Sequence, residues 1–354
     1  MNLLRKRAYA RAGLLGNPSD GYNGKTISLI IRNFHAEVVL YEWDTVEIVL
    51  AEQDRARFRS VQDLARDVEL HGYYGGIRLI KATIKGFVRY CEERGIALHD
   101  RNFSIRYHST IPRQVGLAGS SSIIVATLRC LMEFYGIDIP LEAQPAFVLG
   151  IEREELGIAA GLQDRVIQSY EGLVYMDFDI ERERMVGGYP AYHYEPMDPA
   201  LLPPLYLAYH AGLSEPTEVF HNDLRGQFER GVPKVVEAIR HFASLAEQGR
   251  NALLERDTQR LSALIDENFD TRRTICRLPE WQIEMVETAR ACGVSAKFAG
   301  SGGAIIGVCE DDATFEKLRA RLAELEVQTV RPETAVPAAG GASGSERGRK
   351  RLQR

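Results

Sequence analysis

The 354-residue sequence has no apolar run long enough to span a bilayer, and the basic residues near its start precede no signal-peptide core. Its five cysteines are widely spaced and form no Cys-x-x-Cys pair, which excludes a full disulfide framework. Reduced thiols of this kind are typical of a cytoplasmic protein. The net charge of −5 gives no indication of nucleic acid or an anionic membrane as a partner. We therefore expect a cytoplasmic monomer or homodimer that binds neither membranes nor nucleic acids.

The composition is that of an ordinary globular protein, with 45% apolar and 26% charged residues. The length allows two domains. Residues 187–204 are rich in proline, tyrosine and glycine, which predicts a connection between domains. We expect a first domain over residues 1–200 and a second over residues 201–332. Residues 333–354 are rich in alanine, glycine, serine and basic residues and are predicted to be disordered.

Hydrophobic periodicity predicts both helices and strands, because alternation indicates a strand and spacing of three to four residues indicates a helix. In the first half, strands are predicted at 26–50 (two or three strands), 103–111 and 172–178, and helices at 61–95, 120–135, 144–156 and from 161. In the second half, strands are predicted at 205–210, 304–309 and 327–330, and helices at 219–247, 250–275, 281–292 and 315–325. The second half is therefore predicted to be an α+β module.

A loop rich in glycine and serine connects the predicted strand 103–111 to the predicted helix 120–135. It begins at Pro112, and residues 116–122 are Gly-Leu-Ala-Gly-Ser-Ser-Ser. Backbone N–H groups at a helix N-terminus bind anions, glycine lets a phosphate approach the backbone, and serine hydroxyls add donors or a metal ligand. A helix cap would explain one serine but not three behind two glycines. The loop therefore predicts a phosphate site.

Two acidic residues follow this loop. Glu152 lies at helical spacing from apolar residues on both sides, which places an acid on an otherwise apolar stripe. A carboxylate that faces the core needs a cation, either Mg²⁺ or a paired arginine, whereas Glu154 and Glu155 are expected to face solvent. Asp164 begins a predicted helix, where its negative charge either interacts favourably with the helix dipole or points into a cleft. The neighbouring glycine–serine loop favours the cleft.

Two further glycine-bearing motifs lie near the ends of the chain. Residues 10–20 are Ala-Arg-Ala-Gly-Leu-Leu-Gly-Asn-Pro-Ser-Asp, so that a loop here would carry Arg11, Asn17 and Asp20. Asn-Pro-Ser-Asp is a turn in its own right, and the same residues offer a cation and acceptors for hydroxyl groups. Residues 297–304 are Lys-Phe-Ala-Gly-Ser-Gly-Gly-Ala, which form either a flexible turn or a second backbone cradle for substrate or phosphate.

In this order and spacing the motifs resemble those of the GHMP small-molecule kinases, which include galactokinase, homoserine kinase and mevalonate kinase. Residues 112–122 resemble the family's phosphate-binding motif, residues 11–20 its N-terminal substrate motif, and residues 297–304 its C-terminal glycine-rich motif. The resemblance covers about residues 8–330. It implies an α+β, two-domain fold, with an N-terminal α/β domain like ribosomal protein S5 and a C-terminal ferredoxin-like domain.

The resemblance also implies roles for these residues. Asp164 would accept the proton of the substrate hydroxyl or orient that hydroxyl, and Arg11 would keep Asp164 ionised and face the transferred phosphoryl group. Ser121 and Glu152 would bind Mg²⁺. The residues implied to hold the phosphates of ATP are Pro112, Gly116, Leu117, Ala118, Gly119, Ser120, Ser121 and Ser122.

Longer segments, among them residues 155–166, 172–178, 268–273 and 296–304, are similar to the plant glucuronokinases. This resemblance implies an ATP-dependent sugar 1-kinase that phosphorylates the anomeric hydroxyl of D-glucuronate. The Glu-His of galactokinases is Asn17-Pro18 here, which argues against galactose, and Ser122 stands where the family usually has alanine. The alternatives are a kinase of another sugar or sugar phosphate, such as a heptose phosphate or arabinose, and a non-catalytic nucleotide-binding sensor.

The sugar would be bound by residues from three of the motifs. Candidates for its hydroxyl groups are Asn17, Asp20 and Tyr175, and Gly302 and Gly303 are further substrate contacts. A uronate carboxylate also needs a cation, and arginine suits it because the guanidinium group binds a carboxylate through two hydrogen bonds. The candidate cations, among which the sequence does not choose, are Arg113, Arg165, Arg272, Arg273 and Lys297.

Overall fold

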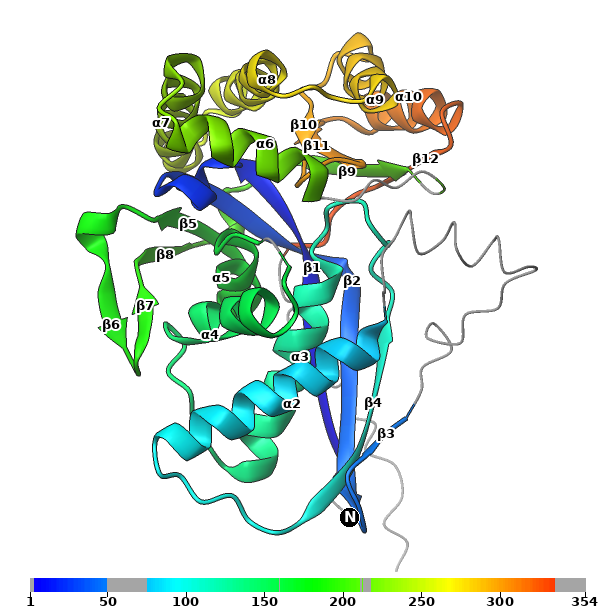
Figure 1. Ribbon diagram of the computed structural model, residues 1–354. Helices are drawn as coiled ribbons and strands as arrows, with labels where there is room; N and C mark the ends of the chain where they lie inside the picture. Colours follow the sequence, from blue (N-terminus) through cyan, green and yellow to red (C-terminus); the bar gives the residue numbers. More distant parts are fainter. Residues whose placement is uncertain (1–2, 50–74, 159, 211, 213–217, 335–354) are drawn as a thin grey trace, which may run out of the picture.

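The computed structural model describes residues 3–49, 75–158, 160–210, 212 and 218–334. Its N-terminal half is built on one long β-hairpin of β1 (Leu3–Leu15) and β2 (Lys25–Trp43), shown in blue in Figure 1. β2 is rich in β-branched and aromatic residues, which favour extended backbone. The whole N-terminal sheet is assembled on this strand.

Both edges of β2 are paired. β1 covers one edge along its length, and the other edge is shared by β4 (Asn102–Ser109) and β5 (Leu173–Asp177). Two short strands extend the sheet: β3 (Glu47–Ile48) beside β4, and β8 (His193–Met197) beside β5. The predicted strands at 103–111 and 172–178 are confirmed, and the described part of 26–50 forms two strands, a long one and a short one, within the two or three predicted.

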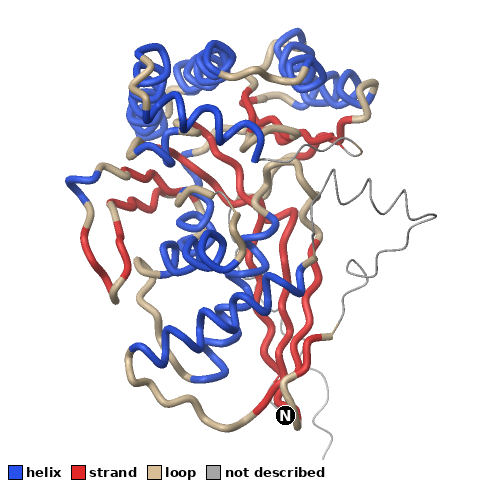
Figure 2. The backbone as a smooth tube through the Cα atoms, viewed as in Figure 1, coloured by secondary structure: helices blue, strands red, loops and turns tan. Residues whose placement is uncertain are grey.

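Helices pack on this sheet and on one another (Figure 2). The helices are α2 (Gly76–Glu93), α3 (Gly119–Tyr135), α4 (Gln144–Gly150) and α5 (Gln163–Tyr170), and a π-helical turn (Ile151–Glu155) follows α4. α3 contacts both β1 and β2, and it ends at Gly136, whose φ of 65° provides the left-handed cap. The predicted helix 120–135 is thereby confirmed.

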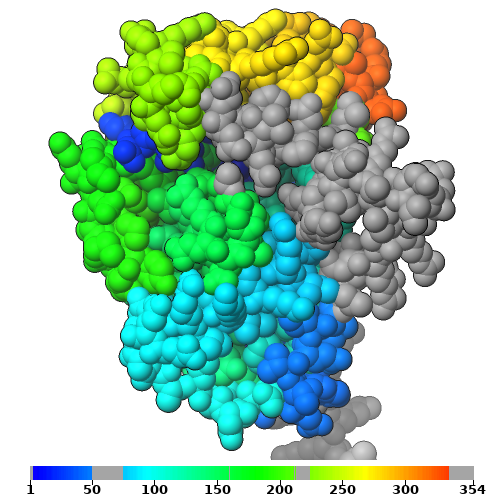
Figure 3. Space-filling model, in the orientation of Figure 1, coloured from blue at the N-terminus to red at the C-terminus, as the bar shows by residue number. Residues whose placement is uncertain are grey.

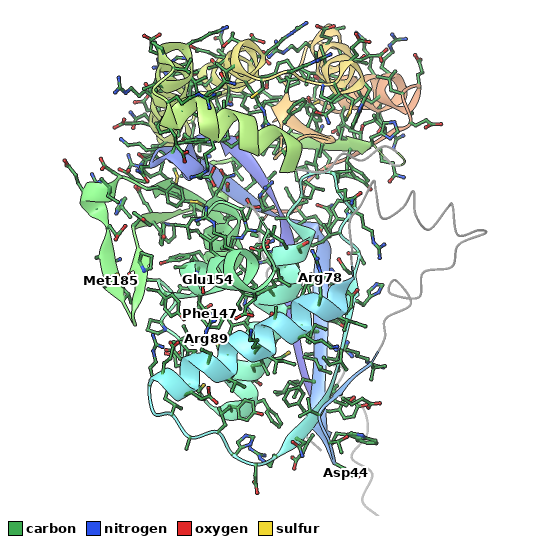
Figure 4. The ribbon with its side chains drawn as sticks, in the orientation of Figure 1. Asp44, Arg78, Arg89, Phe147, Glu154 and Met185 are labelled. Atoms are coloured by element: carbon green, nitrogen blue, oxygen red, sulfur yellow. The ribbon has the colours of Figure 1, made fainter. Side chains whose placement is uncertain are left out.

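The predicted helix 144–156 is α-helical only as far as Gly150. The π-helical turn widens the following turn, so that side chains no longer keep α-helical spacing. Glu154 is 67% exposed, as expected, and Figure 4 shows it on the outer face of the molecule near Arg89 of α2. The solvent-facing prediction for Glu155 is wrong, because its side chain is only 9% exposed and pairs with Lys85 at 2.6 Å.

The C-terminal half has a four-stranded antiparallel sheet in the order β10-β11-β9-β12. Its strands are β9 (Leu205–His210), β10 (Lys297–Phe298), β11 (Ala304–Val308) and β12 (Val327–Val330). Its helices are α6 (Glu218–Glu229), α7 (Pro233–Glu255), α8 (Thr258–Ile275), α9 (Glu280–Ala291) and α10 (Asp312–Ala323). The predicted mixture of helix and strand, the α+β class, is confirmed for both halves.

The prediction that residues 187–204 only connect two domains is wrong. This segment forms β7 (Tyr189–Ala191), which pairs with β6 (Arg184–Val186), and then β8. β8 contains Pro196, which is tolerated because β8 is the last strand of the sheet and its outer edge needs no N–H donor. The proposed boundary near residue 200 lies between β8 and β9 and stays a prediction.

Two predicted helix boundaries in the second half are also wrong. The predicted helix 219–247 is interrupted at Gly231, whose φ is +70°, and α7 starts at Pro233. The predicted helix 250–275 begins too early, since α7 continues to Glu255 and α8 begins after Asp257, whose side chain accepts a hydrogen bond from the Arg260 N–H. Local turn chemistry therefore outweighed the continuous apolar pattern.

Other predicted segments fall partly outside the described residues. The predicted helix 61–95 is confirmed only over α2, because residues 50–74 are not described. The predicted disordered tail 333–354 lies outside the described residues apart from 333 and 334. Glu333 differs from the prediction, because its carbonyl accepts from the Arg32 N–H and its N–H donates to the side chain of Asn33.

The two halves share one hydrophobic core. Leu15 and Ile27 of the hairpin and Phe242 of α7 belong to the same cluster of buried residues, and all three are inaccessible to solvent. Figure 3 shows the C-terminal half, coloured lime to orange, capping one end of the molecule directly above blue residues of the hairpin turn. Among the described helices, none is both long and apolar enough to cross a membrane.

This shared core predicts the effect of truncating Phe242. Phe242→Ala should lower the free energy of unfolding by about 3–5 kcal/mol, because it leaves a cavity between α7 and the hairpin. Leu254→Ala, on the same helix but 49% exposed, should change it by less than about 0.5 kcal/mol. Urea unfolding followed by circular dichroism measures both. Equal effects of the two substitutions would contradict the shared core.

Candidate active site

The glycine–serine loop ends in an uncapped helix N-terminus. Gln114, Gly116 and Ala118 have positive φ angles of 54°, 70° and 60°, so the chain turns sharply before α3. Ala118 is the N-cap residue of α3, and no side chain caps this end of the helix. The first N–H groups of a helix have no partner within it and are attractive to anions. The local geometry is therefore suited to a phosphate group.

The three serines of the loop differ in what they offer. Ser120 is partly exposed, whereas Ser121 and Ser122 are buried. The Ser121 hydroxyl lies 3.2 Å from the Ala118 carbonyl, to which it donates. The Ser122 hydroxyl contacts the Tyr9 and Ala118 carbonyls at 3.1 and 2.9 Å and accepts from Gln168 Nε2 at 2.7 Å. The Ser122 side chain thus anchors α3 to β1 and has no donor left for a phosphate.

Arg11 connects this loop to the predicted catalytic acid. The sequence placed Arg11 in a loop, but it lies on β1, where its side chain is buried. Its Nε donates to Asp164 Oδ1 at 2.6 Å, and its Nη1 donates to the Gly116 carbonyl at 2.6 Å and the Ala299 carbonyl at 2.9 Å. One guanidinium group therefore contacts α5, the glycine–serine loop and the C-terminal glycine motif.

The two glycine-bearing loops touch one another beside Arg11. A Cβ atom at Gly300 would lie 2.2 Å from the Gly116 carbonyl oxygen and 2.6 Å from Arg11 Nη1, so only glycine fits there. Gly303 has a φ of +78° and packs against Val115. Gly302 lies against the Gln282 side chain. Gly302 and Gly303, the predicted substrate contacts, thus pack against the glycine–serine loop. A role for them in binding substrate stays a prediction.

Glu152 is buried and forms an ion pair with Arg165. The guanidinium of Arg165 also lies 3.3 Å from Asp164 Oδ2 and donates to the Gly161 carbonyl. Burial raises the pKa of Glu152, and the adjacent guanidinium opposes that effect. This is the arginine-paired acid that the sequence allowed as the alternative to a metal ligand. A magnesium ion at Glu152 and Ser121 would have hard oxygen ligands, but it would share the carboxylate with Arg165.

Asp20 lies in the N-terminal turn, the segment between β1 and β2, and its side chain faces α5. Its Oδ2 faces the Gln163 N–H at 3.4 Å, and a Cβ atom at Gly161 would lie 2.1 Å from the same oxygen. Burial, and then the negative charge of Asp164, raise the pKa of Asp20 to about 6. The structure therefore brings Arg11 and Asp20 of the N-terminal motif together with Asp164, which lies more than 140 residues later in the chain.

Lys297 is hydrogen-bonded to three oxygen atoms of the protein. It is fully buried on β10, and its Nζ donates to the Gly13 carbonyl at 2.7 Å, Asn17 Oδ1 at 2.6 Å and the Phe298 carbonyl at 2.8 Å. All three ammonium donors are therefore used by the protein. Burial lowers the pKa of Lys297 well below its ordinary value, and nearby arginines add to this. Lys297 thus fixes the N-terminal turn; a contact with substrate would require it to release one of these bonds, and that role stays a prediction.

Other predicted substrate contacts have different surroundings. The side-chain oxygen of Asn17 accepts from Lys297, and Tyr175 is buried on β5 with Arg250 over its ring. Arg272 is buried and donates to the Gly300 and Ser301 carbonyls, each at 2.8 Å. Arg273 is exposed and pairs with Glu287 at 2.9 Å. Arg113 lies exposed in the phosphate loop.

Three amide side chains that the motifs did not predict hold the site together. Asn268 of α8 accepts from the Gly16 N–H at 2.8 Å and donates to the Asn17 carbonyl at 3.2 Å. Gln168 donates to Ser122 and Ala118, and Gln163 lies against Gly13. Asn268 and Gln163 lie in the segments 268–273 and 155–166 that carried the narrower resemblance, which was the available signal.

Comparisons with known proteins identify relatives of the whole chain. The model of the GHMP kinases N terminal domain matches residues 78–172, and that of the GHMP kinases C terminal domain matches residues 250–327. Glucuronokinase 1 of Arabidopsis thaliana is 44% identical over 89% of this chain and 87% of its own, and probable glucuronokinase 2 of the same plant is 45% identical over 88% and 86%. The structure of Lactococcus lactis galactokinase in complex with galactose has a TM-score of 0.76 at 14% identity, covering 94% of each chain.

Removing the Lys297 ammonium should destabilise the protein. Lys297→Met leaves two carbonyl groups and an amide oxygen without a donor and should lower the free energy of unfolding by about 2–4 kcal/mol. The exposed residue Lys317 provides the control Lys317→Met, which should have no measurable effect. Urea unfolding measures both variants. Unchanged stability of Lys297→Met would show that the ammonium does not hold the turn.

The raised pKa of Asp20 makes stability depend on pH. Because its pKa is higher in the folded state, folding favours the protonated form; this contribution is present below pH 4 and is lost as the pH rises through about 6. Asp20→Asn cannot ionise, so its melting temperature should rise relative to wild type between pH 4.5 and pH 7.5. The exposed Asp138→Asn should show no such change. A difference that is constant with pH would contradict the assignment.

Proposed function

The chain belongs to the GHMP kinase family, and we propose that it transfers the γ-phosphoryl group of ATP to the anomeric hydroxyl of D-glucuronate. Arg11 carries the proposal, because its guanidinium contacts Asp164 and the Gly116 carbonyl, each at 2.6 Å. An acid that can take up a proton is thereby held beside a loop suited to phosphate. Identity of 44% with a glucuronokinase supports the choice of glucuronate.

In the proposed reaction the N–H groups at the start of α3 hold the phosphates of ATP. Asp164 accepts the proton of the sugar's anomeric hydroxyl or orients this hydroxyl for attack. Arg11 favours the ionised form of Asp164 and offers positive charge to the phosphoryl group in transfer. Ser121 and Glu152 would hold a magnesium ion, which when bound neutralises charge on the phosphates.

Asp20 is proposed to accept a hydrogen bond from a sugar hydroxyl. Its carboxylate faces the first turn of α5, the helix that carries Asp164, so a sugar bound to Asp20 is close to the proposed base. Asn17, whose amide oxygen is held by Lys297, fixes the turn rather than the sugar. This division distinguishes Asp20 as a substrate contact from Asn17 as a positioning residue.

A substrate panel tests the choice of acceptor. ADP release should be fastest with D-glucuronate among uronates, neutral hexoses, arabinose and heptose phosphates, and phosphorus NMR of the product should show phosphate on the anomeric oxygen. A higher kcat/KM on a heptose phosphate or arabinose would replace glucuronate within the same reaction class. No turnover on any of them, with ATP still bound, would support a non-catalytic nucleotide-binding protein.

Removing the proposed base tests the mechanism. Asp164→Asn should lower kcat by about 10²–10⁴-fold, because the amide cannot take up the hydroxyl proton. Its affinity for ATP should stay within about twofold of wild type, since phosphate binding depends on the α3 N-terminus. The exposed Asp138→Asn serves as the control. Near-normal turnover of Asp164→Asn, measured by coupled ADP release, would remove Asp164 from the chemistry.

A further inference from the structure

The proposed function leaves the partner of the uronate carboxylate open. Arg165 is committed to Glu152 and Asp164, and Arg272 and Lys297 donate to protein oxygens. Arg273 lies on the exposed side of α8 and pairs with Glu287. Four of the five cations proposed from the sequence are therefore engaged, and the fifth, Arg113, lies exposed in the glycine–serine loop that is proposed to hold the phosphates. Further arginines near Asp20 are not among these candidates.

Two arginines that were not among the candidate cations are anchored to backbone near Asp20. Arg153, in the π-helical turn, donates through Nε and Nη2 to the Ala160 carbonyl at 3.0 and 2.6 Å. The next residue, Gly161, packs against the Asp20 carboxylate. Arg225 of α6 donates through Nη2 to the Gly21 carbonyl at 3.2 Å, one residue after Asp20. Both guanidinium groups are thus fixed to backbone next to the proposed sugar contact.

The charges of these two arginines are poorly compensated. Among the described residues, Arg153 makes no ion pair with a carboxylate, and its hydrogen bonds use a neutral carbonyl. Within the described part of the chain, the carboxylate paired with Arg225 is that of Glu229 at 3.8 Å, in a pair whose side chains are 49% and 64% exposed. Burial and the nearby positive charges of Arg225 and Arg165 lower the pKa of Arg153. An anion bound here would relieve this repulsion.

We propose that Arg153 and Arg225 form the subsite that binds the carboxylate of the sugar acid and selects it over the corresponding neutral sugar. Two guanidinium groups provide planar pairs of N–H donors, the geometry that suits a carboxylate. The bonds of Arg153 to Ala160 use Nε and Nη2 and not Nη1. The Nη1 group of Arg225 lies 3.8 Å from Glu229, too far for a hydrogen bond. Asp20, whose neighbouring backbone holds Arg225, is left to accept from a hydroxyl group. This inference rests on the proposed function.

The test compares D-glucuronate with its neutral amide, D-glucuronamide, in Arg153→Gln, Arg225→Gln and the double variant. The double variant should raise KM for glucuronate by at least about 30-fold while kcat stays within about threefold, because charge-assisted hydrogen bonds to the ground state are lost. KM for glucuronamide should change by less than about threefold. Arg319→Gln is the matched control: Arg319 lies on α10 with its side chain 58% exposed, and the substitution should leave both substrates unaffected.

The outcomes separate the inference from the proposed function. An unchanged KM for glucuronate, or an equal loss on both substrates, would overturn the carboxylate subsite and leave the glucuronate kinase in place. A wild-type enzyme that turns over neither compound but phosphorylates another sugar would overturn the proposed function and the subsite with it. Should the double variant fail to fold by circular dichroism, Arg153→Lys and Arg225→Lys replace it; they keep the charge and should raise KM by about 3- to 10-fold.

Discussion

The buried guanidinium of Arg11 is the interaction on which the rest of the site depends. It joins Asp164 of α5 to the Gly116 carbonyl of the phosphate loop and the Ala299 carbonyl of the C-terminal glycine motif. A buried charge is tolerated only when it is paired and hydrogen-bonded, and Arg11 meets this condition with one carboxylate and two carbonyl groups. Because its fork of donors has a fixed geometry, it also fixes the distance between the acid and the loop.

Lys297 has a corresponding role on the other side of β1, with different physics. Its three partners are two carbonyl groups and an amide oxygen, with no carboxylate among them. Burial without a compensating negative charge lowers its pKa, whereas Arg11 faces an ionisable acid. Asn268 adds two more hydrogen bonds to the same turn. The C-terminal half therefore determines the position of the turn that carries Asp20, although this turn belongs to the N-terminal hairpin.

Several acidic side chains and several arginines lie close together around Asp20. Asp20 and Asp164 repel one another, and this repulsion together with burial raises the pKa of Asp20 to about 6. Arg11 and Arg165 oppose this shift, and each is already paired with an acid, Arg11 with Asp164 and Arg165 with Glu152. Arg153 and Arg225 lie outside these pairs. An acidic sugar entering this region would meet a carboxylate that can hold a hydroxyl group and two cations that can hold its own carboxylate.

Much of the fold was predictable from sequence, because strands such as 103–111 and helices such as 120–135 follow from local periodicity. The errors have local causes: Pro196 and the tyrosines suggested a linker where an edge strand forms, and Gly231 and Arg256 break apolar patterns that look continuous. Sequence spacing correctly predicts that Glu152 faces the core, but it does not decide whether the carboxylate binds a metal ion or pairs with an arginine. Only the structure paired it with Arg165.

The sequence by itself determined the chemical inventory: a glycine–serine loop before a helix, an acid at the start of α5, a turn with Asp20, and a second glycine motif. The order of these motifs was sufficient for the family, because backbone cradles and helix starts are encoded locally. Tertiary structure decided which cations are already hydrogen-bonded to groups of the protein. Lys297 and Arg272 satisfy buried carbonyl groups, whereas Arg153 and Arg225 are bonded to backbone near Asp20. These assignments depend on contacts between residues far apart in the chain, and a local pattern carries no information about them.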